Sequence, residues 1–177
     1  MSLWTQYPGL KFHWNAIVAA ANTHKLDPVL VAAVVLKESS ANSDAFRHEP
    51  NFWNRYMKLT PQFKGLNPRR YSSSYGLMQP MWVVATERGF PSDLPPELLF
   101  VPETGLDYGC RQLRLLTDWA DTGWPQIAPQ TRLEAILASY NGGRGGNTPG
   151  TALRNHSYAR AVLALHALLV SERAGLP

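Results

Sequence analysis

One apolar segment, VLVAAVVLKESS at residues 29–40, narrows the possible folds more than any other part of the chain. Val31, Val34 and Val35 follow the i, i+3, i+4 spacing of one face of an α-helix. Glu38 lies at i+7 from Val31 and therefore falls on the same face. Carboxylates are rarely buried without a partner or a chemical task. The segment thus predicts a helix that packs inward, and it makes Glu38 the first candidate for function.

The rest of the chain also has helical patterns, separated by stretches that are rich in Pro and Gly. Thr131 is available as an N-terminal helix cap, and Gly142 and Gly143 are a C-terminal stop for the same helix. We find no internal repeat and no strand-like alternation longer than a few residues. The sequence predicts a mainly α-helical fold that forms a single domain over residues 1–177. The expected helices span residues 12–25, 28–38, 80–89, 102–119, 131–141 and 155–171.

Residues 41–75 differ from the rest because they are polar, contain proline and are rich in aromatic side chains. A stretch of this length without a clear period is usually either disordered or a functional loop region. Its aromatic content favours order, so we expect a loop region with short helices. The proline-rich residues 91–105 are expected to form a connector, and residues 142–150 a glycine-rich loop.

Charge and hydropathy exclude several classes of partner. The net charge is +4, which favours an anionic polymer, but Lys and Arg are scattered, so nucleic-acid binding is not expected. No run reaches the ~18 apolar residues of a membrane span, so membrane insertion is not expected either. The first residues lack the layout of a signal peptide, although a chain whose leader had been removed would look the same. We expect a monomer.

Metal and cofactor sites are not expected. Cys110 is the only cysteine, which excludes an internal disulfide and a Cys-rich zinc site. It lies at helical spacing with Leu106 and Leu113, so core packing is preferred over a reactive thiol. The five histidines show no ligand spacing with one another.

Four short motifs contain residues with useful chemistry: Glu38-Ser39, SYGLMQ, SYNGG, and Tyr158 on the last expected helix. Each alone has an ordinary structural explanation. Glu38 could pair with an arginine, GLMQ could combine core residues with a surface amide, and NGG could simply end a helix. Tyr140 and Tyr158 both lie on apolar stripes, as core tyrosines do. The order and separation of the motifs are therefore more informative than any single one.

Together the motifs resemble the goose-type lysozyme and soluble lytic transglycosylase family, whose members cut the glycan strands of peptidoglycan. The family pattern is Glu-Ser at the end of a buried helix, then Gly-Leu-Met-Gln, then Ala-Tyr-Asn-Gly-Gly, then a Tyr on the closing helix. The resemblance covers about residues 25–165 and implies a lysozyme-like fold. Ser139 replaces the family's usual Ala, and the loop at 44–71 is longer and more similar to phage-type relatives. The matching residues are Glu38-Ser39, Gly76-Leu77-Met78-Gln79, Ser139-Tyr140-Asn141-Gly142-Gly143 and Tyr158.

The resemblance implies that Glu38 is the catalytic acid. Its apolar setting predicts a raised pKa, because desolvation disfavours the charged form. In the family a single Glu protonates the leaving oxygen and then takes a proton from the C6 hydroxyl of the same muramic acid, which gives a 1,6-anhydro end. Tyr158 is expected to donate a hydrogen bond to Glu38. The expected substrate-binding residues are Ser39, Gly76, Met78, Gln79, Tyr140, Asn141 and Tyr158.

Two alternatives stay open. A hydrolytic muramidase would cut the same bond with a second carboxylate that places a water, and Asp44 and Glu49 are the candidates for it. A non-catalytic glycan-binding or virion structural module would keep the fold without the activity. The apparent lack of a signal peptide leads us to expect delivery to the cell wall by a phage lysis or virion-associated route, or the loss of a leader.

Overall fold

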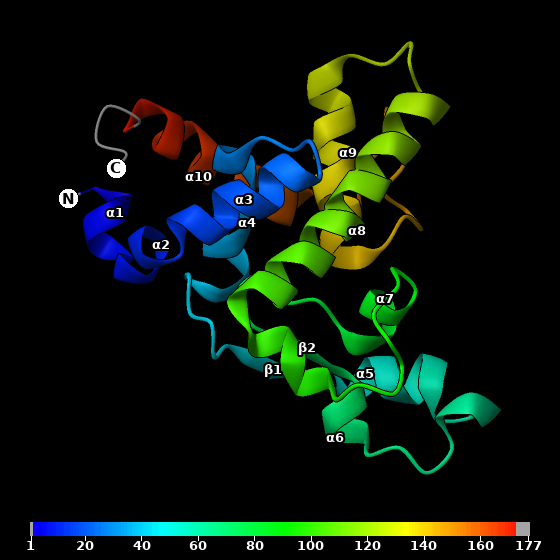
Figure 1. The fold of residues 1–177 in the computed structure, drawn as a ribbon. Coiled ribbons are helices and arrows are strands. Elements are labelled where there is room, and N and C mark those ends of the chain that lie inside the picture. Colours follow the sequence, from blue (N-terminus) through cyan, green and yellow to red (C-terminus); the bar gives the residue numbers. More distant parts are fainter. Residues whose placement is uncertain (1, 173–177) are drawn as a thin grey trace.

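The computed structural model describes residues 2–172, in which long helices form one lobe and short elements form another (Figure 1). We call residues 2–44 and 101–172 the helical lobe, and residues 45–100 the small lobe. In the view of Figure 1 the small lobe lies below the crossing helices. The helical lobe contains α1 (Leu3–Gln6), α2 (Pro8–Phe12), α3 (Trp14–Thr23), α4 (Pro28–Ser39), α8 (Pro102–Gly123), α9 (Pro129–Gly142) and α10 (His156–Ser171).

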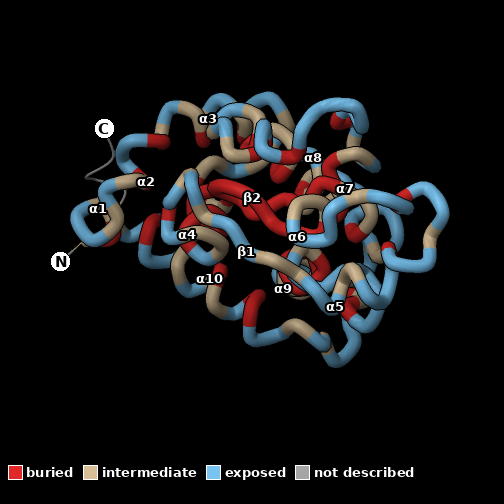
Figure 2. Tube along the Cα trace, turned by 90° about the horizontal axis from the view of Figure 1, so that it is seen from below, coloured by how far each residue is buried: buried red, intermediate tan, exposed pale blue. Residues whose placement is uncertain are grey.

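The small lobe is organised around a two-stranded antiparallel sheet in which Arg47 lies opposite Ser74. The strand β2 is buried along its length and lies against the helices, whereas β1 is largely exposed (Figure 2). A π-helical turn follows α5, and such turns are frequent at functional sites. The elements are β1 (Phe46–His48), α5 (Pro50–Phe52), the π-helix η1 (Trp53–Met57), the 3-10 helix η2 (Pro61–Phe63), α6 (Pro68–Tyr71), β2 (Ser73–Tyr75), α7 (Trp82–Thr86) and the 3-10 helix η3 (Pro96–Phe100).

Local signals define both ends of α4. The Asp27 carboxylate accepts a hydrogen bond from the Val29 amide at 3.0 Å, and Pro28 occupies the first helical turn. At the other end Ser40 adopts a left-handed conformation with φ of 54° and stops the helix. The residues from Val31 to Leu36 are all buried, because α4 contacts both α3 and α10. Glu38 therefore lies in the last turn of α4, a helix whose position is fixed by buried packing.

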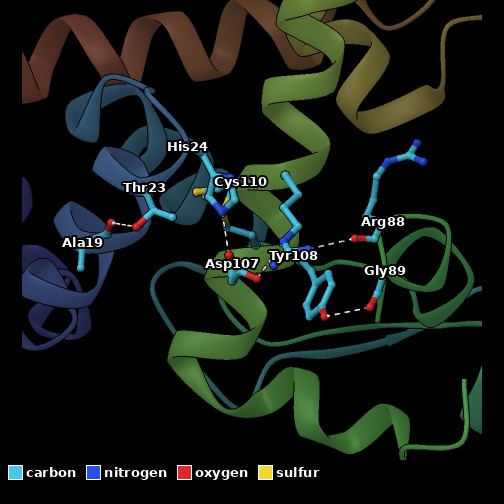
Figure 3. A network of polar contacts seen from close by, with 10 residues as sticks. Ala19, Thr23, His24, Arg88, Gly89, Asp107, Tyr108 and Cys110 are labelled. Carbon is cyan, nitrogen blue, oxygen red and sulfur yellow. Dashed lines mark hydrogen bonds and ion pairs between the residues drawn. The ribbon is translucent and has the colours of Figure 1, made fainter. Parts of the chain in front are cut away.

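Polar contacts attach α8 to both lobes (Figure 3). The Asp107 carboxylate lies 2.6 Å from Nε2 of His24, which follows α3, and it accepts from Nε of Arg111 at 2.9 Å. The Tyr108 hydroxyl donates to the carbonyl of Gly89, in the segment after α7, at 3.3 Å. Because these contacts come from one turn of α8, that helix fixes the small lobe relative to the helical lobe.

The mainly helical fold predicted from the sequence is confirmed, including the helices at 28–38 and 155–171 and a long helix that begins at 102. Cys110 is fully buried in the core, as predicted. The loop region at 41–75 contains the expected short helices and, in addition, the two three-residue strands. Within residues 2–172, no helix has both the length and the apolar character needed to cross a membrane.

Four details of the predicted helices were wrong. The helix expected at 80–89 is shortened to α7 (Trp82–Thr86). The expected helix at 12–25 is interrupted at His13, where the end of α2 meets the start of α3. The helix that begins at 102 continues to Gly123, because Ala120 still packs in the core. Thr131 is not a cap: α9 begins two residues earlier at Pro129, since proline suits the first turn of a helix. The connector at 91–105 also contains η3.

Candidate active site

The side chain of Glu38 lines a groove of about 710 Å³ between the two lobes. The small lobe contributes apolar and aromatic side chains to its wall, among them Phe52, Tyr56 and Val84. The helical lobe contributes Glu38 from the end of α4 and the SYNGG segment from the end of α9. The acid therefore lies where a rigid, buried helix ends at an open cleft of a size typical of ligand sites.

Among residues 2–172, the Glu38 carboxyl group has one direct hydrogen-bond partner, the hydroxyl of Tyr158, which donates to Oε1 at 2.6 Å. Burial raises the pKa of Glu38 above its ordinary value. The Tyr158 hydrogen bond and the positive charges of Arg47 and Lys37 oppose this rise in pKa, and the charge of Glu49 adds to it. Desolvation is the largest of these effects, so Glu38 keeps its proton to higher pH than a free glutamate. The hydrogen bond expected from Tyr158 is present.

The turn at residues 76–79 is held by backbone contacts. Gly76 has φ of 64°, and an added Cβ would lie 2.6 Å from the carbonyl oxygen of Leu99. The Gln79 amide nitrogen donates to the carbonyls of Ala45 at 2.9 Å and of Gly76 at 2.8 Å. The Ser39 hydroxyl lies 2.8 Å from the carbonyl of Leu77, which joins α4 to the turn. Gly76 and the Ser39 hydroxyl thus hold the turn, and neither residue is among those that line the groove.

Met78 also has a different position from the one expected. Its side chain is fully buried, with Sδ 3.8 Å from the Cys110 sulfur and close against Gly109. It does not line the groove, because the turn directs it into the core between the lobes. Its carbonyl accepts a hydrogen bond from the Tyr140 hydroxyl at 2.8 Å. Tyr140 does line the groove, and burial together with the nearby Glu38 raises its pKa, so its hydroxyl stays protonated.

Two further asparagines, Asn147 and Asn155, orient Asn141. Of the three, only Asn141 was singled out from the sequence. The Nδ2 of Asn147 donates to the Gly143 carbonyl at 2.8 Å, and its Oδ1 accepts from the Asn155 amide at 3.1 Å, so backbone groups determine its orientation. Asn147 Nδ2 also lies 3.3 Å from Oδ1 of Asn155. The remaining Asn155 nitrogen donates to Oδ1 of Asn141 at 2.8 Å. Asn141 lines the groove, and with Oδ1 engaged it has its NH₂ group as the donor that it can offer there.

Gly142 makes this arrangement possible. An added Cβ there would lie 2.2 Å from Oδ1 of Asn155, so only glycine lets Asn155 lie against the end of α9. The sequence indicated a glycine-rich loop at this point, but Asn147 and Asn155 carry no motif of their own. Asn147 is fully buried, and a buried amide in a loop of this composition is apparent only from the coordinates.

The two carboxylates considered as partners of Glu38 lie in different surroundings. Glu49 lines the groove and accepts a hydrogen bond from Nε of Arg47 at 2.5 Å. Asp44 is exposed on the preceding loop and does not line the groove. Arg47 itself was not singled out from the sequence, because a lone arginine on a three-residue strand forms no pattern. Within residues 2–172, no three His, Cys, Asp or Glu side chains gather in a way that could hold a metal ion.

The comparisons with known proteins agree with this fold and arrangement. The family described as the transglycosylase SLT domain matches residues 15–159. The chain belongs to this family. A solved structure, the X-ray structure of an inactive Glu-to-Gln mutant of the lytic transglycosylase Slt from Pseudomonas aeruginosa, matches with a TM-score of 0.64 and 19% identity. No curated protein matches the sequence.

The match to that structure covers 97% of this chain but 26% of the other, so this chain spans about a quarter of the Pseudomonas protein's length. At 19% identity the likeness establishes a shared fold. The mainly helical, lysozyme-like fold expected from the motifs is therefore the fold of a lytic transglycosylase.

Proposed function

We propose that the protein is a peptidoglycan lytic transglycosylase that cuts the β-1,4 bond between MurNAc and GlcNAc and uses Glu38 as its single acid and base. One observation carries this proposal: a glutamate with a raised pKa lies at the floor of a large groove and is held by the Tyr158 hydroxyl. A raised pKa favours the protonated form of the carboxyl group, which is the form that acts as a general acid.

In the proposed reaction, Glu38 gives its proton to the glycosidic oxygen, and the bond from that oxygen to C1 of MurNAc breaks. The positive charge that develops at C1 is neutralised when the C6 hydroxyl oxygen of the same sugar bonds to C1. Glu38, now a carboxylate, takes the proton of that hydroxyl and returns to its starting state. Tyr158 favours the carboxylate form by donating to Oε1, so it assists the half of the cycle in which Glu38 is charged. The products are a 1,6-anhydromuramic end and a free GlcNAc end.

A hydrolytic muramidase is the second candidate, and the place of Glu49 in the groove favours it over the remaining alternatives. In that reaction a water held by Glu49 would attack C1 and leave a reducing end. The existing contact between Glu49 and Arg47 argues against this role, because the carboxylate is already engaged by a cation. Delivery to the cell wall by a phage lysis or virion-associated route remains part of the proposal and rests on the phage-like character of residues 44–71.

The mass spectrum of muropeptides released from purified sacculi tests the proposal. Wild-type protein should release anhydromuramic ends, each lighter than a reducing end by one water. Glu38→Gln should lose activity by about a hundredfold to ten-thousandfold, the usual contribution of a general acid. The control Glu87→Gln changes an exposed glutamate outside the groove and should match wild type.

Three outcomes would count against the proposal. Products with only reducing ends would favour the muramidase, and loss of those ends in Glu49→Gln would identify its base. Equal clearing of cell walls by wild type and Glu38→Gln would exclude Glu38 as the acid. Binding to sacculi without any release of muropeptides would favour a non-catalytic module.

A further inference from the structure

A second, smaller pocket adjoins the groove at Glu38. It has a volume of about 320 Å³ and shares Glu38, Arg47 and Asn141 with the groove. Its other lining residues are Lys37, Ser157 and Tyr158, from α4 and the first turn of α10. A substrate that bridges the two spaces would therefore pass directly over the acid, with different parts of the substrate on either side.

Basic side chains outnumber carboxyl groups in the lining of this pocket. Lys37 is exposed, and its Nζ lies 6.0 Å from the centre of the Tyr158 ring. Arg47 contacts Glu49 through Nε, while its side chain remains 55% exposed. The only carboxyl group in the lining is Glu38, which is kept neutral to higher pH by its burial. Lys37 and the exposed part of Arg47 thus place positive charge at a pocket whose one lining carboxyl group, Glu38, is itself held by the Tyr158 hydroxyl.

Hydrogen-bond donors complete the lining. The Oδ1 of Asn141 is occupied by Asn155, so Asn141 offers its NH₂ group. Ser157 adds an exposed hydroxyl. An ammonium, a guanidinium, an amide NH₂ and a hydroxyl around one small volume suit an anionic oxygen ligand, and a carboxylate is the simplest such ligand.

We propose that this pocket binds a carboxylate carried by the muramic acid side of the substrate, with Lys37 as the residue that recognises it. The inference rests on the proposed function, because a muramic acid residue carries a lactyl group from which a peptide stem extends. The carboxylate has two possible sources: the peptide stem, or the lactyl group itself where no peptide is attached. In either case the pocket distinguishes charged from neutral glycan and places the charged substituent next to the acid.

The test couples a charge on the protein to a charge on the substrate. Glycan strands are prepared with native peptide stems, with the stem carboxylates converted to carboxamides by carbodiimide and ammonia, and with the peptides removed to free the lactyl carboxylate. The rate of anhydromuramic end formation gives kcat/KM for wild type, Lys37→Gln and the control Lys11→Gln. Lys11 is exposed on α2 and lines neither space.

If the stem carboxylate is the ligand, conversion to carboxamides should lower kcat/KM of wild type and Lys11→Gln by about threefold to fivefold, the range of an exposed charge pair. Lys37→Gln should already be slower on native strands and should change little on conversion. Any effect of Lys37 on the pKa of Glu38 is the same for both substrates and cancels in their ratio. If the lactyl carboxylate is the ligand, Lys37→Gln should instead be selectively slow on peptide-free strands.

The inference is overturned if Lys37→Gln and Lys11→Gln behave alike on all three substrates. It is also overturned if Lys37→Gln slows all three by one common factor, because that result is independent of any carboxylate. A complete lack of anhydromuramic ends with wild type on every substrate is a different result, since it removes the proposed function.

Discussion

The cores of the helical lobe and of the small lobe differ in amino-acid composition. The core of the helical lobe is aliphatic, with fully buried residues such as Val31, Leu106 and Leu137 on regular helices. The core of the small lobe is rich in aromatic rings that meet edge to face, for example Tyr71 and Trp82 at 4.8 Å. Its strands have three residues each, and all of its helices have five or fewer. The two cores meet the groove from opposite sides.

This difference indicates a division of labour. A general acid needs a fixed position and a low-dielectric setting, and α4 provides both because it is buried almost all round. The opposite wall needs a surface that fits a polymer, and exposed aromatic side chains on short elements provide it, with Tyr56 at 54% exposure. Changes in the helical lobe should therefore alter stability and the acid, whereas changes on the surface of the small lobe away from Arg47 and Glu49 should alter neither.

A Leu-to-Ala substitution in each lobe gives the largest expected contrast in the free energy of unfolding. Leu137→Ala removes a fully buried side chain from α9 and should lower the free energy of unfolding by about 2–5 kcal/mol. Leu59→Ala in the small lobe removes a side chain that is 91% exposed and should change it by less than about 0.5 kcal/mol. Denaturant unfolding followed by circular dichroism measures both. Equal losses would mean that Leu59 is covered in solution, and the contrast between the lobes would fail at that point.

Alanine substitutions at two glycines of α8 test how closely the two lobes pack against each other. An added Cβ at Gly109 would lie 2.6 Å from Cβ and Sδ of Met78, so Gly109→Ala should displace the turn at 76–79 and cost about 1–3 kcal/mol. It should also reduce activity, since the Met78 carbonyl anchors Tyr140. Gly123→Ala, on the same helix, meets no atom within 4 Å and should be neutral or stabilising by up to about 1 kcal/mol. Thermal unfolding and sacculus digestion of both variants would show whether the close contact at Gly109 matters.

The helical lobe was largely predictable from the sequence because its apolar residues recur with the period of an α-helix. The spacing of Val31, Val34 and Val35 predicted the buried helix, and the position of Glu38 on that face predicted its raised pKa. Helix ends were less predictable, since proline at 129 and threonine at 131 both suit a start and only packing decides between them. Local patterns therefore predicted which face is buried better than where each helix begins.

The small lobe was less predictable because its order comes from contacts between residues distant in sequence. Strands of three residues show no alternation, so β1 and β2 were not visible. The placement of Met78 and of the three asparagines has the same cause: a motif gives the identity of a residue, but its direction depends on partners such as Gly109 and Asn155. Arg47 lies at the site because β1 pairs with β2, and no local sequence pattern indicates that pairing.

The smallest expected effect concerns the balance of forces on Glu38. Because the Tyr158 hydroxyl donates to Oε1, it stabilises the carboxylate, and its removal in Tyr158→Phe should raise the pKa of Glu38 further. A general acid works only when protonated, so activity falls as pH rises through this pKa, and the alkaline limb of kcat/KM should move to higher pH in the variant. Tyr108→Phe loses a hydroxyl bonded to Gly89 outside the groove and should leave the limb in place. A limb that moved to lower pH in Tyr158→Phe would mean that the Tyr158 hydroxyl favours the protonated form of Glu38 and not its carboxylate.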